Sequence, residues 1–363
     1  MCKDFIYAGD MNCSEHSMKN NLGILAVVLA ASFLFILLPY QVDADEGTFS
    51  YYAQLDDNEK AIFDAICAAE LNEREINVDL PIKITATGET RENYLVNVIH
   101  AMKNNVRAAL ELSAPMAYWT WGDSKFTFDA VISMNGNTAT LHEINMKLDL
   151  NPAYDDDPST PEVNELHEKM DALIKAIDAF STKRTDKRGI VEDINNYLTG
   201  LVTYETEPDN YNKTPFIHDA YGALVSPNRA VCDGYSKAFL LLCEKEGIEC
   251  LIDQGSALPS TEGHAWNYVK MDNGKWYGID VTWNDNNDNG YFLLGADTFF
   301  SSHMRGTYLK DGSVYWPFNL PETFSKDKYD ADPPSYEKYA WIFAILIIAL
   351  LAFALYRSTK EKW

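Results

Sequence analysis

Three short segments between residues 228 and 285 decide the fold: AVCDGY (230–235), GHAWNYV (263–269) and WYGIDVTW (276–283). The first opens a predicted helix, and the other two are predicted strands. A thiol, an imidazole and a carboxylate occur in that order at Cys232, His264 and Asp280, each near the edge of a regular element. These are the side chains of a nucleophilic acyl-transfer site, in which a base activates the nucleophile and a third group orients the base.

Cys232 is predicted to lie at a helix N-terminus, because apolar residues at helical spacing follow it and Gly247 stands where a C-terminal cap belongs. The helix dipole and unpaired backbone N–H groups at that end lower a thiol pKa from about 8.5 by one to several units. The same N–H groups can bind an oxyanion. The alternative is a buried, inert cysteine, which is the commonest fate of this residue type.

The turn at residues 272–274 decides whether His264 and Asp280 meet. A two-residue turn would place Asp280 opposite Asn267, on the other sheet face from His264. A three-residue loop would pair Asp280 with Trp266, so that the two site residues become diagonal neighbours on one face, about 7–8 Å apart at Cα. Gly274 supplies the left-handed position of such a loop. We therefore predict a three-residue loop, or a bulge of equal effect.

These segments, together with AYGALV (220–225) and KWYGIDVTWND (275–285), resemble the transglutaminase-like superfamily, and most closely its microbial, often surface-exposed branch. The resemblance is specific from about residue 185 to 294 and diffuse before it. It implies a papain-like α+β core with Cys232 as nucleophile, His264 as base and Asp280 as the orienting group. The family includes transglutaminases, peptidases and amidases, which form a thioester at the cysteine. It also includes members without the triad that serve as binding modules.

Other residues near the three segments are weaker candidates. Tyr221 is a candidate oxyanion donor because it lies in the matched run before Cys232, and packing is the alternative. Trp266 and Trp283 are candidates for lining a substrate groove, although such aromatic residues more often form sheet core.

No cofactor or metal is expected from the motifs. The turn that begins at Asp285 follows the first half of a calcium-loop pattern, but Ala296 occupies the position of the closing glutamate. A polar turn is therefore favoured over a weak Ca²⁺ site. Zinc-type spacing of Cys and His is absent from the sequence. Cys243 and Cys250 are a conceivable disulfide pair, with small apolar core residues as the equally good alternative.

Two uncharged apolar runs of 17 residues bracket the chain, at 22–38 and 340–356. This is the short limit for a membrane-spanning helix. Aromatic residues flank the second run and Lys and Arg follow it, which predicts a transmembrane anchor over 339–357 with a cytoplasmic tail at 358–363. Residues 1–44 are predicted to be a cleaved signal peptide or an uncleaved signal anchor. Both alternatives place the main domain outside the cytoplasm, at the cell membrane.

The net charge of −24 comes from the middle of the chain, where residues 20–356 carry 25 basic and 50 acidic groups. So acidic a surface repels nucleic acid, which we exclude as a partner. Helical and alternating patterns predict a small α+β domain at 45–152, and the Asp- and Pro-rich stretch 151–161 separates it from a transglutaminase-like domain at 153–335.

The prediction is thus a membrane-anchored extracytoplasmic cysteine enzyme acting on peptide or protein amides at the cell surface. The alternative is a non-catalytic surface module that binds protein or envelope polymer in the same groove. A third hypothesis is a zymogen masked by residues 45–150.

Overall fold

The computed structural model describes most of the chain between residues 49 and 330. The described residues are 49–69, 75–116, 127–147, 163–207, 215–260, 262–285, 290–308 and 314–330, with Ile345 and Ile347. The predicted N-terminal segment 1–44, the boundary 151–161, the tail 358–363 and nearly all of the anchor 339–357 lie outside them. Within the described part, no helix combines the length and the apolar character that crossing a bilayer requires.

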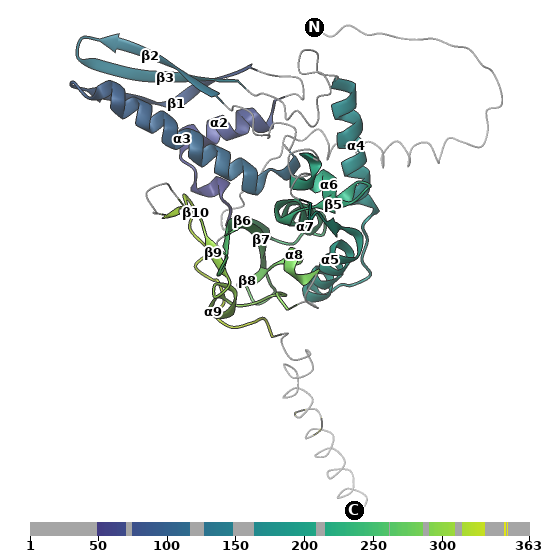
Figure 1. The fold of residues 1–363 in the computed structure, drawn as a ribbon. Coiled ribbons are helices and arrows are strands. Elements are labelled where there is room, and N and C mark those ends of the chain that lie inside the picture. Colours follow the sequence, from purple (N-terminus) through teal and green to yellow (C-terminus); the bar gives the residue numbers. More distant parts are fainter. Residues whose placement is uncertain are drawn as a thin grey trace, which may run out of the picture.

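The N-terminal part is a three-stranded antiparallel sheet with two helices against it (Figure 1). Asp56 and Glu59 exchange hydrogen bonds at the start of its first α-helix and form a capping box. Strand order is β1-β3-β2, and the hairpin turns through Gly136 at φ 59°. The elements are η1 (Tyr52–Gln54), α2 (Asp57–Cys67), β1 (Glu75–Thr87), α3 (Arg91–Ser113), β2 (Thr127–Asn135) and β3 (Thr138–Lys147).

The helices that follow surround the one that begins at Cys232. Two helices precede it in the chain, at Val163–Ala179 and Lys187–Leu201. Gly247 ends α7 with φ 68°, as predicted for a C-terminal cap. The elements are α4 (Val163–Ala179), α5 (Lys187–Leu201), β4 (Thr203–Tyr204), η4 (Pro215–His218), α6 (Ala220–Leu224), β5 (Arg229–Ala230) and α7 (Cys232–Lys245).

The second sheet has four strands in the order β8-β7-β6-β9, all antiparallel to their neighbours. Asn267 ties it to α7 by donating from its side-chain amide to the carbonyl oxygen of Ser236 at 3.0 Å. The elements are β6 (Cys250–Ala257), β7 (Glu262–Lys270), β8 (Trp276–Ile279), α8 (Val281–Asn284), α9 (Ala296–Phe299), β9 (His303–Arg305), β10 (Thr307–Tyr308) and β11 (Val314–Tyr315). The molecule is therefore α+β, as predicted.

The predicted loop between β7 and β8 is confirmed. Lys270 pairs with Trp276, and the backbone N–H of Met271 donates to the carbonyl oxygen of Lys275 at 2.9 Å, which leaves residues 272–274 as the loop. Gly274 takes the left-handed position, with φ 76°. One detail differs from the prediction: β8 ends at Ile279, so Asp280 does not lie within the strand but is the N-cap of the short helix α8.

The two faces of the second sheet pack into different cores. Val269 and Ile279 pack with α7 and its neighbouring helices. Trp266 and Tyr268, on the other face, share one hydrophobic cluster with buried residues of α2, α3 and the first sheet. Helix α3 contacts both the first sheet and β6 (Figure 1). Residues on both sides of the predicted boundary at 152 thus contribute to a single core.

A buried ion pair lies within this second sheet. Arg305 of β9 donates to the carboxylate of Asp253 of β6, which has no exposed surface. Between the two strands, Gly255 leaves room for a close approach: a Cβ there would lie 1.9 Å from the carbonyl oxygen of Met304. The pair and the glycine together hold β9 against β6.

Candidate active site

Cys232 is the first residue of α7, as predicted, and it is partly exposed. Its helix follows directly from β5, and Val231 at the N-cap position has an extended backbone. Cys232 lines a cleft of about 470 Å³. A thiol in this position is reachable from solvent and lies beside the unpaired backbone N–H groups at the start of the helix.

His264 lies between Cys232 and Asp280. Its ring is buried, with 8% of the residue exposed, and it borders the same cleft as the thiol. Nε2 is 2.7 Å from Oδ2 of Asp280, and Cys232 is near enough to raise the pKa of the ring. Because Nε2 is used by the carboxylate, Nδ1 is the nitrogen left for the thiol.

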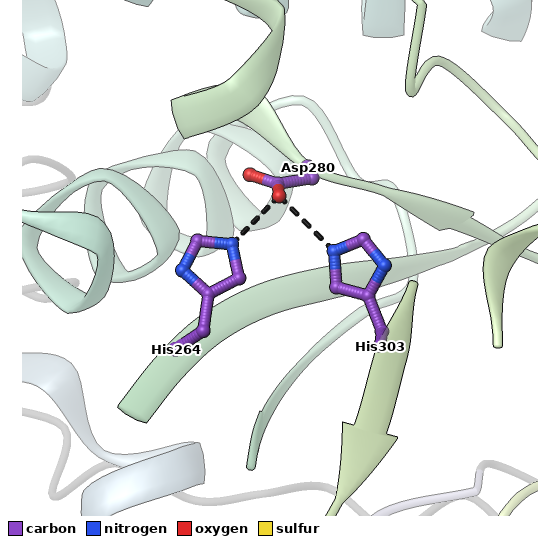
Figure 2. A group of neighbouring side chains, drawn as sticks. All are labelled: His264, Asp280 and His303. Atoms are coloured by element: carbon purple, nitrogen blue, oxygen red, sulfur yellow. Dashed lines mark hydrogen bonds and ion pairs between the residues drawn. The ribbon is translucent and has the colours of Figure 1, made fainter. Parts of the chain in front are cut away.

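Asp280 is fully buried and is held through both of its oxygens. Oδ1 accepts the backbone N–H of Trp283 at 3.0 Å, which is the N-cap bond of α8. Oδ2 accepts from His264 and also from Nε2 of His303, at 3.1 Å (Figure 2). The end of one strand and the start of one helix therefore fix the carboxylate in place.

Direct hydrogen bonds explain the grouping of His264, Asp280 and His303 without an ion. Their nitrogen and oxygen atoms all lie within 4.8 Å of one another, which is the spacing of a possible metal site. Ligands arranged tetrahedrally at about 2.0–2.1 Å around zinc are, however, about 3.3 Å apart. The 2.7 Å between His264 and Asp280 is too short for that arrangement and is typical of a charge-assisted hydrogen bond.

The electrostatics favour a charged pair. Burial alone lowers the pKa of His264, but the hydrogen bond to Asp280 and the proximity of Cys232 outweigh it and raise the pKa to about 10. Burial alone raises the pKa of Asp280, and the hydrogen bonds from His264 and His303 outweigh it, so that this pKa is lowered. The imidazolium form that accompanies a thiolate is thus stabilised, and His264 can later return its proton to a leaving group.

The pKa of His264 predicts how its contribution to stability depends on pH. The folded-state pKa of about 10 exceeds the unfolded value of about 6.5, so the contribution is complete below about pH 6.5 and is lost as the pH rises towards 10. The lowered pKa of Asp280 acts at the acidic end, where its contribution is lost as the pH falls below about 4. Unfolding free energies of wild type and His264→Gln should therefore converge from about pH 6.5 to about 10. A difference that stays constant over this range would contradict the assigned pKa.

The weaker candidates have different fates. Trp283 stacks on the His264 ring with centroids 4.8 Å apart, but it is not among the described residues that line the cleft. Trp266 is fully buried beneath the site and donates its indole N–H to Tyr268 Oη, so it does not line the cleft. Tyr221 lines a separate cavity of about 140 Å³ and is not brought to Cys232. Trp266 and Tyr221 differ from the prediction because the packing of the elements that carry them decides where these rings point.

Among the possible calcium ligands of the turn that begins at Asp285, only Asp285 itself lies in the described part of the chain. Asp285 accepts the hydroxyl of Tyr235 at 2.8 Å, which ties it to α7. Residues 286–289 of that turn lie outside the described part of the chain.

Three residues of the site were not anticipated. His303 has no motif around it and reaches Asp280 only because β9 pairs with β6, with His303 opposite Ala257. Gln254 of β6 also lines the cleft. His218 lines the cleft from η4 and pairs with Asp233 at 2.9 Å, and this hydrogen bond raises the pKa of His218. A histidine just before the matched AYGALV run was the available sequence signal for His218.

The described cysteines are all free thiols: Cys67, Cys232, Cys243 and Cys250. Cys243 is fully buried near Cys250, and burial raises its pKa well above the usual value. Cys67 is also protected, since burial raises its pKa to about 12. Cys232 differs from these two in opening onto a cleft beside a histidine.

A cysteine at a helix N-terminus, joined to a histidine and a buried aspartate on an adjacent antiparallel sheet, has the geometry of a thiol acyl-transfer centre. Residues 174–281 match the family model of the transglutaminase-like superfamily, so this part of the chain is a transglutaminase-like core. The predicted resemblance is confirmed. Among curated proteins, none matches the chain.

Several solved structures are similar over part of their length. A crystal structure of a TGase is 17% identical and covers 42% of this chain and 44% of its own, with a TM-score of 0.29. A candidate cysteine protease from Cytophaga hutchinsonii is 12% identical over 44% and 62% of the two chains, with a TM-score of 0.25. The periplasmic domain of TgpA from Pseudomonas aeruginosa is 11% identical over 44% and 69%, with a TM-score of 0.16. The present chain thus spans less than two thirds of the first two.

Proposed function

We propose that the protein is a cysteine enzyme that cleaves or transfers the acyl groups of peptide or protein amides. The observation that carries the proposal is that Cys232 and His264 line one open cleft and that His264 is hydrogen-bonded to the buried Asp280. The family core contributes the expectation of thioester chemistry at the cysteine.

In the proposed mechanism, the Cys232 thiolate attacks the amide carbonyl and His264 donates its proton to the leaving amine. The resulting thioester is attacked by water, which gives hydrolysis, or by an amine, which gives a new amide. Backbone N–H groups at the start of α7 would bind the oxyanion. We assign Gln254, and not Tyr221, as the side-chain hydrogen-bond donor to the oxyanion, because Gln254 lines the cleft.

The location of the enzyme belongs to the same proposal. The two apolar runs at 22–38 and 340–356 support a membrane-anchored protein whose catalytic domain lies outside the cytoplasm. Its substrates would then be peptides or proteins at the cell surface. All the described residues that line the cleft lie between 218 and 306. None of them belongs to residues 45–150, the segment that the zymogen hypothesis places over the site.

The purified ectodomain, incubated with a glutamine- and amide-rich protein such as casein, tests the proposal and separates hydrolysis from transfer. Release of peptide fragments or ammonia measures hydrolysis, and covalent incorporation of a fluorescent primary amine measures transfer. Iodoacetamide labelling, read by peptide mass spectrometry, measures thiol reactivity directly. We expect Cys232 to label faster than Cys243 and Cys250. Equal labelling rates for the three thiols, unchanged in His264→Gln, would favour the binding module instead.

A further inference from the structure

His303 shares the oxygen of Asp280 that orients His264. Both histidine Nε2 atoms contact Oδ2, at 2.7 Å and 3.1 Å (Figure 2). A carboxylate oxygen has two lone-pair sites, and an ionised carboxylate only accepts hydrogen bonds. Both sites of Oδ2 are therefore filled, and both histidines must carry a hydrogen on Nε2.

His303 is fixed independently of the cleft. It is 1% exposed, and its ring stacks on Phe299 with centroids 4.0 Å apart and planes within 7°. Nδ1 lies 3.1 Å from the carbonyl oxygen of Phe299 and 3.0 Å from the hydroxyl of Ser302. The cleft-lining residues do not include His303. It therefore has no contact with a substrate in the cleft, and it acts on the site through Asp280 and through its ring contacts with His264 and Trp283, at centroid distances of 5.6 Å and 4.5 Å.

The hydrogen bond from His303 to Asp280 affects the geometry of His264. With only the backbone N–H of Trp283 and one histidine, a fully buried carboxylate would lack a donor and could turn to satisfy its free lone pair. Such a turn would change the direction of the hydrogen bond that holds Nε2–H of His264 and leaves Nδ1 for Cys232. A fixed second donor prevents this movement.

We propose that His303 is a positioning residue that locks Asp280, and through it the orientation and tautomer of His264, so that the site works as a Cys-His-Asp-His unit. This inference rests on the proposed function of Cys232. It adds a fourth group to the expected triad.

Two substitutions of His303 separate positioning from packing. His303→Phe keeps the aromatic stack on Phe299 but removes the donor to Asp280. His303→Gln loses the stack but keeps an N–H donor near the position of Nε2. We expect His303→Phe to lower kcat and the rate of Cys232 alkylation about 10- to 100-fold with little change in KM, and His303→Gln to retain more of both. His142→Phe, which replaces a histidine of the first sheet, is the matched control and should be neutral.

The outcomes distinguish this inference from the proposed function. If His303→Phe is as active as wild type, or if His303→Gln is the more damaged variant at equal Tm, the positioning role is wrong and the proposed function stands. If Cys232 in the wild type labels no faster than Cys243, the proposed function fails and this inference fails with it. Tm values for each variant show whether a loss of rate comes from unfolding.

Discussion

Replacing Cys232 with alanine is expected to lower the rate of hydrolysis or amine transfer by on the order of 10³-fold or more, because no thioester can form without the thiol. The folded protein should remain intact, since Cys232 is partly exposed at the edge of its helix and fills no core position. Initial rates on the protein substrate and thermal unfolding of the same preparation check both halves of this expectation.

Cys243→Ala is the matched control for this experiment. Cys243 lies on the same helix but is fully buried in the core against Cys250. Its removal should cost stability while the rate at a permissive temperature changes little. Activity that survives in Cys232→Ala and disappears in Cys243→Ala would rule out the proposed nucleophile.

Replacing Arg305 with methionine is expected to cost about 3–5 kcal/mol in the free energy of unfolding, because it leaves a buried charge without its partner. Asp253 has no exposed surface and its carboxylate accepts from Arg305. Burial already raises the pKa of Asp253 in spite of the arginine. The loss would be measured by urea unfolding at neutral pH.

The double variant Arg305→Met/Asp253→Asn tests the cause of that loss. Removing both charges should recover much of the stability, because the isolated carboxylate is what the single variant cannot tolerate. Arg184→Met is the surface control: its pair with Asp193 is 4.0 Å long and half exposed, and such pairs contribute little. Equal losses in the single and double variants would show that the packing of the Arg305 side chain matters more than its charge.

Local sequence patterns were sufficient to place the three expected catalytic side chains on their neighbouring elements. Apolar spacing and Gly247 placed Cys232 at a helix N-terminus, and the loop argument placed His264 and Asp280 on one face, because both depend on short-range rules of backbone geometry. The change from strand to helix at Asp280 was missed. An aspartate followed by Val-Thr-Trp fits a strand by propensity, and only the N-cap hydrogen bond to Trp283 reveals the turn.

Long-range packing was not accessible in the same way. His303 meets Asp280 through the pairing of β9 with β6, two strands separated by more than 40 residues, and nothing in the residues around His303 specifies that register. Tyr221 illustrates the opposite failure. It is close to Cys232 in the sequence, yet it lines a different cavity, because the short helix α6 carries it away from the cleft.

The register between β7 and β8 also determines whether an inactive population can accumulate. Gly278 faces the ring of Phe299 so closely that a Cβ would lie 2.4 Å from it. A slip of one residue would aim Tyr277 or Ile279 at that ring and expose the α7 side of the sheet. A chain with this misaligned register would therefore unfold and would not persist as a folded but inactive enzyme. The stability of the fold and the alignment of the site thus depend on the same glycine.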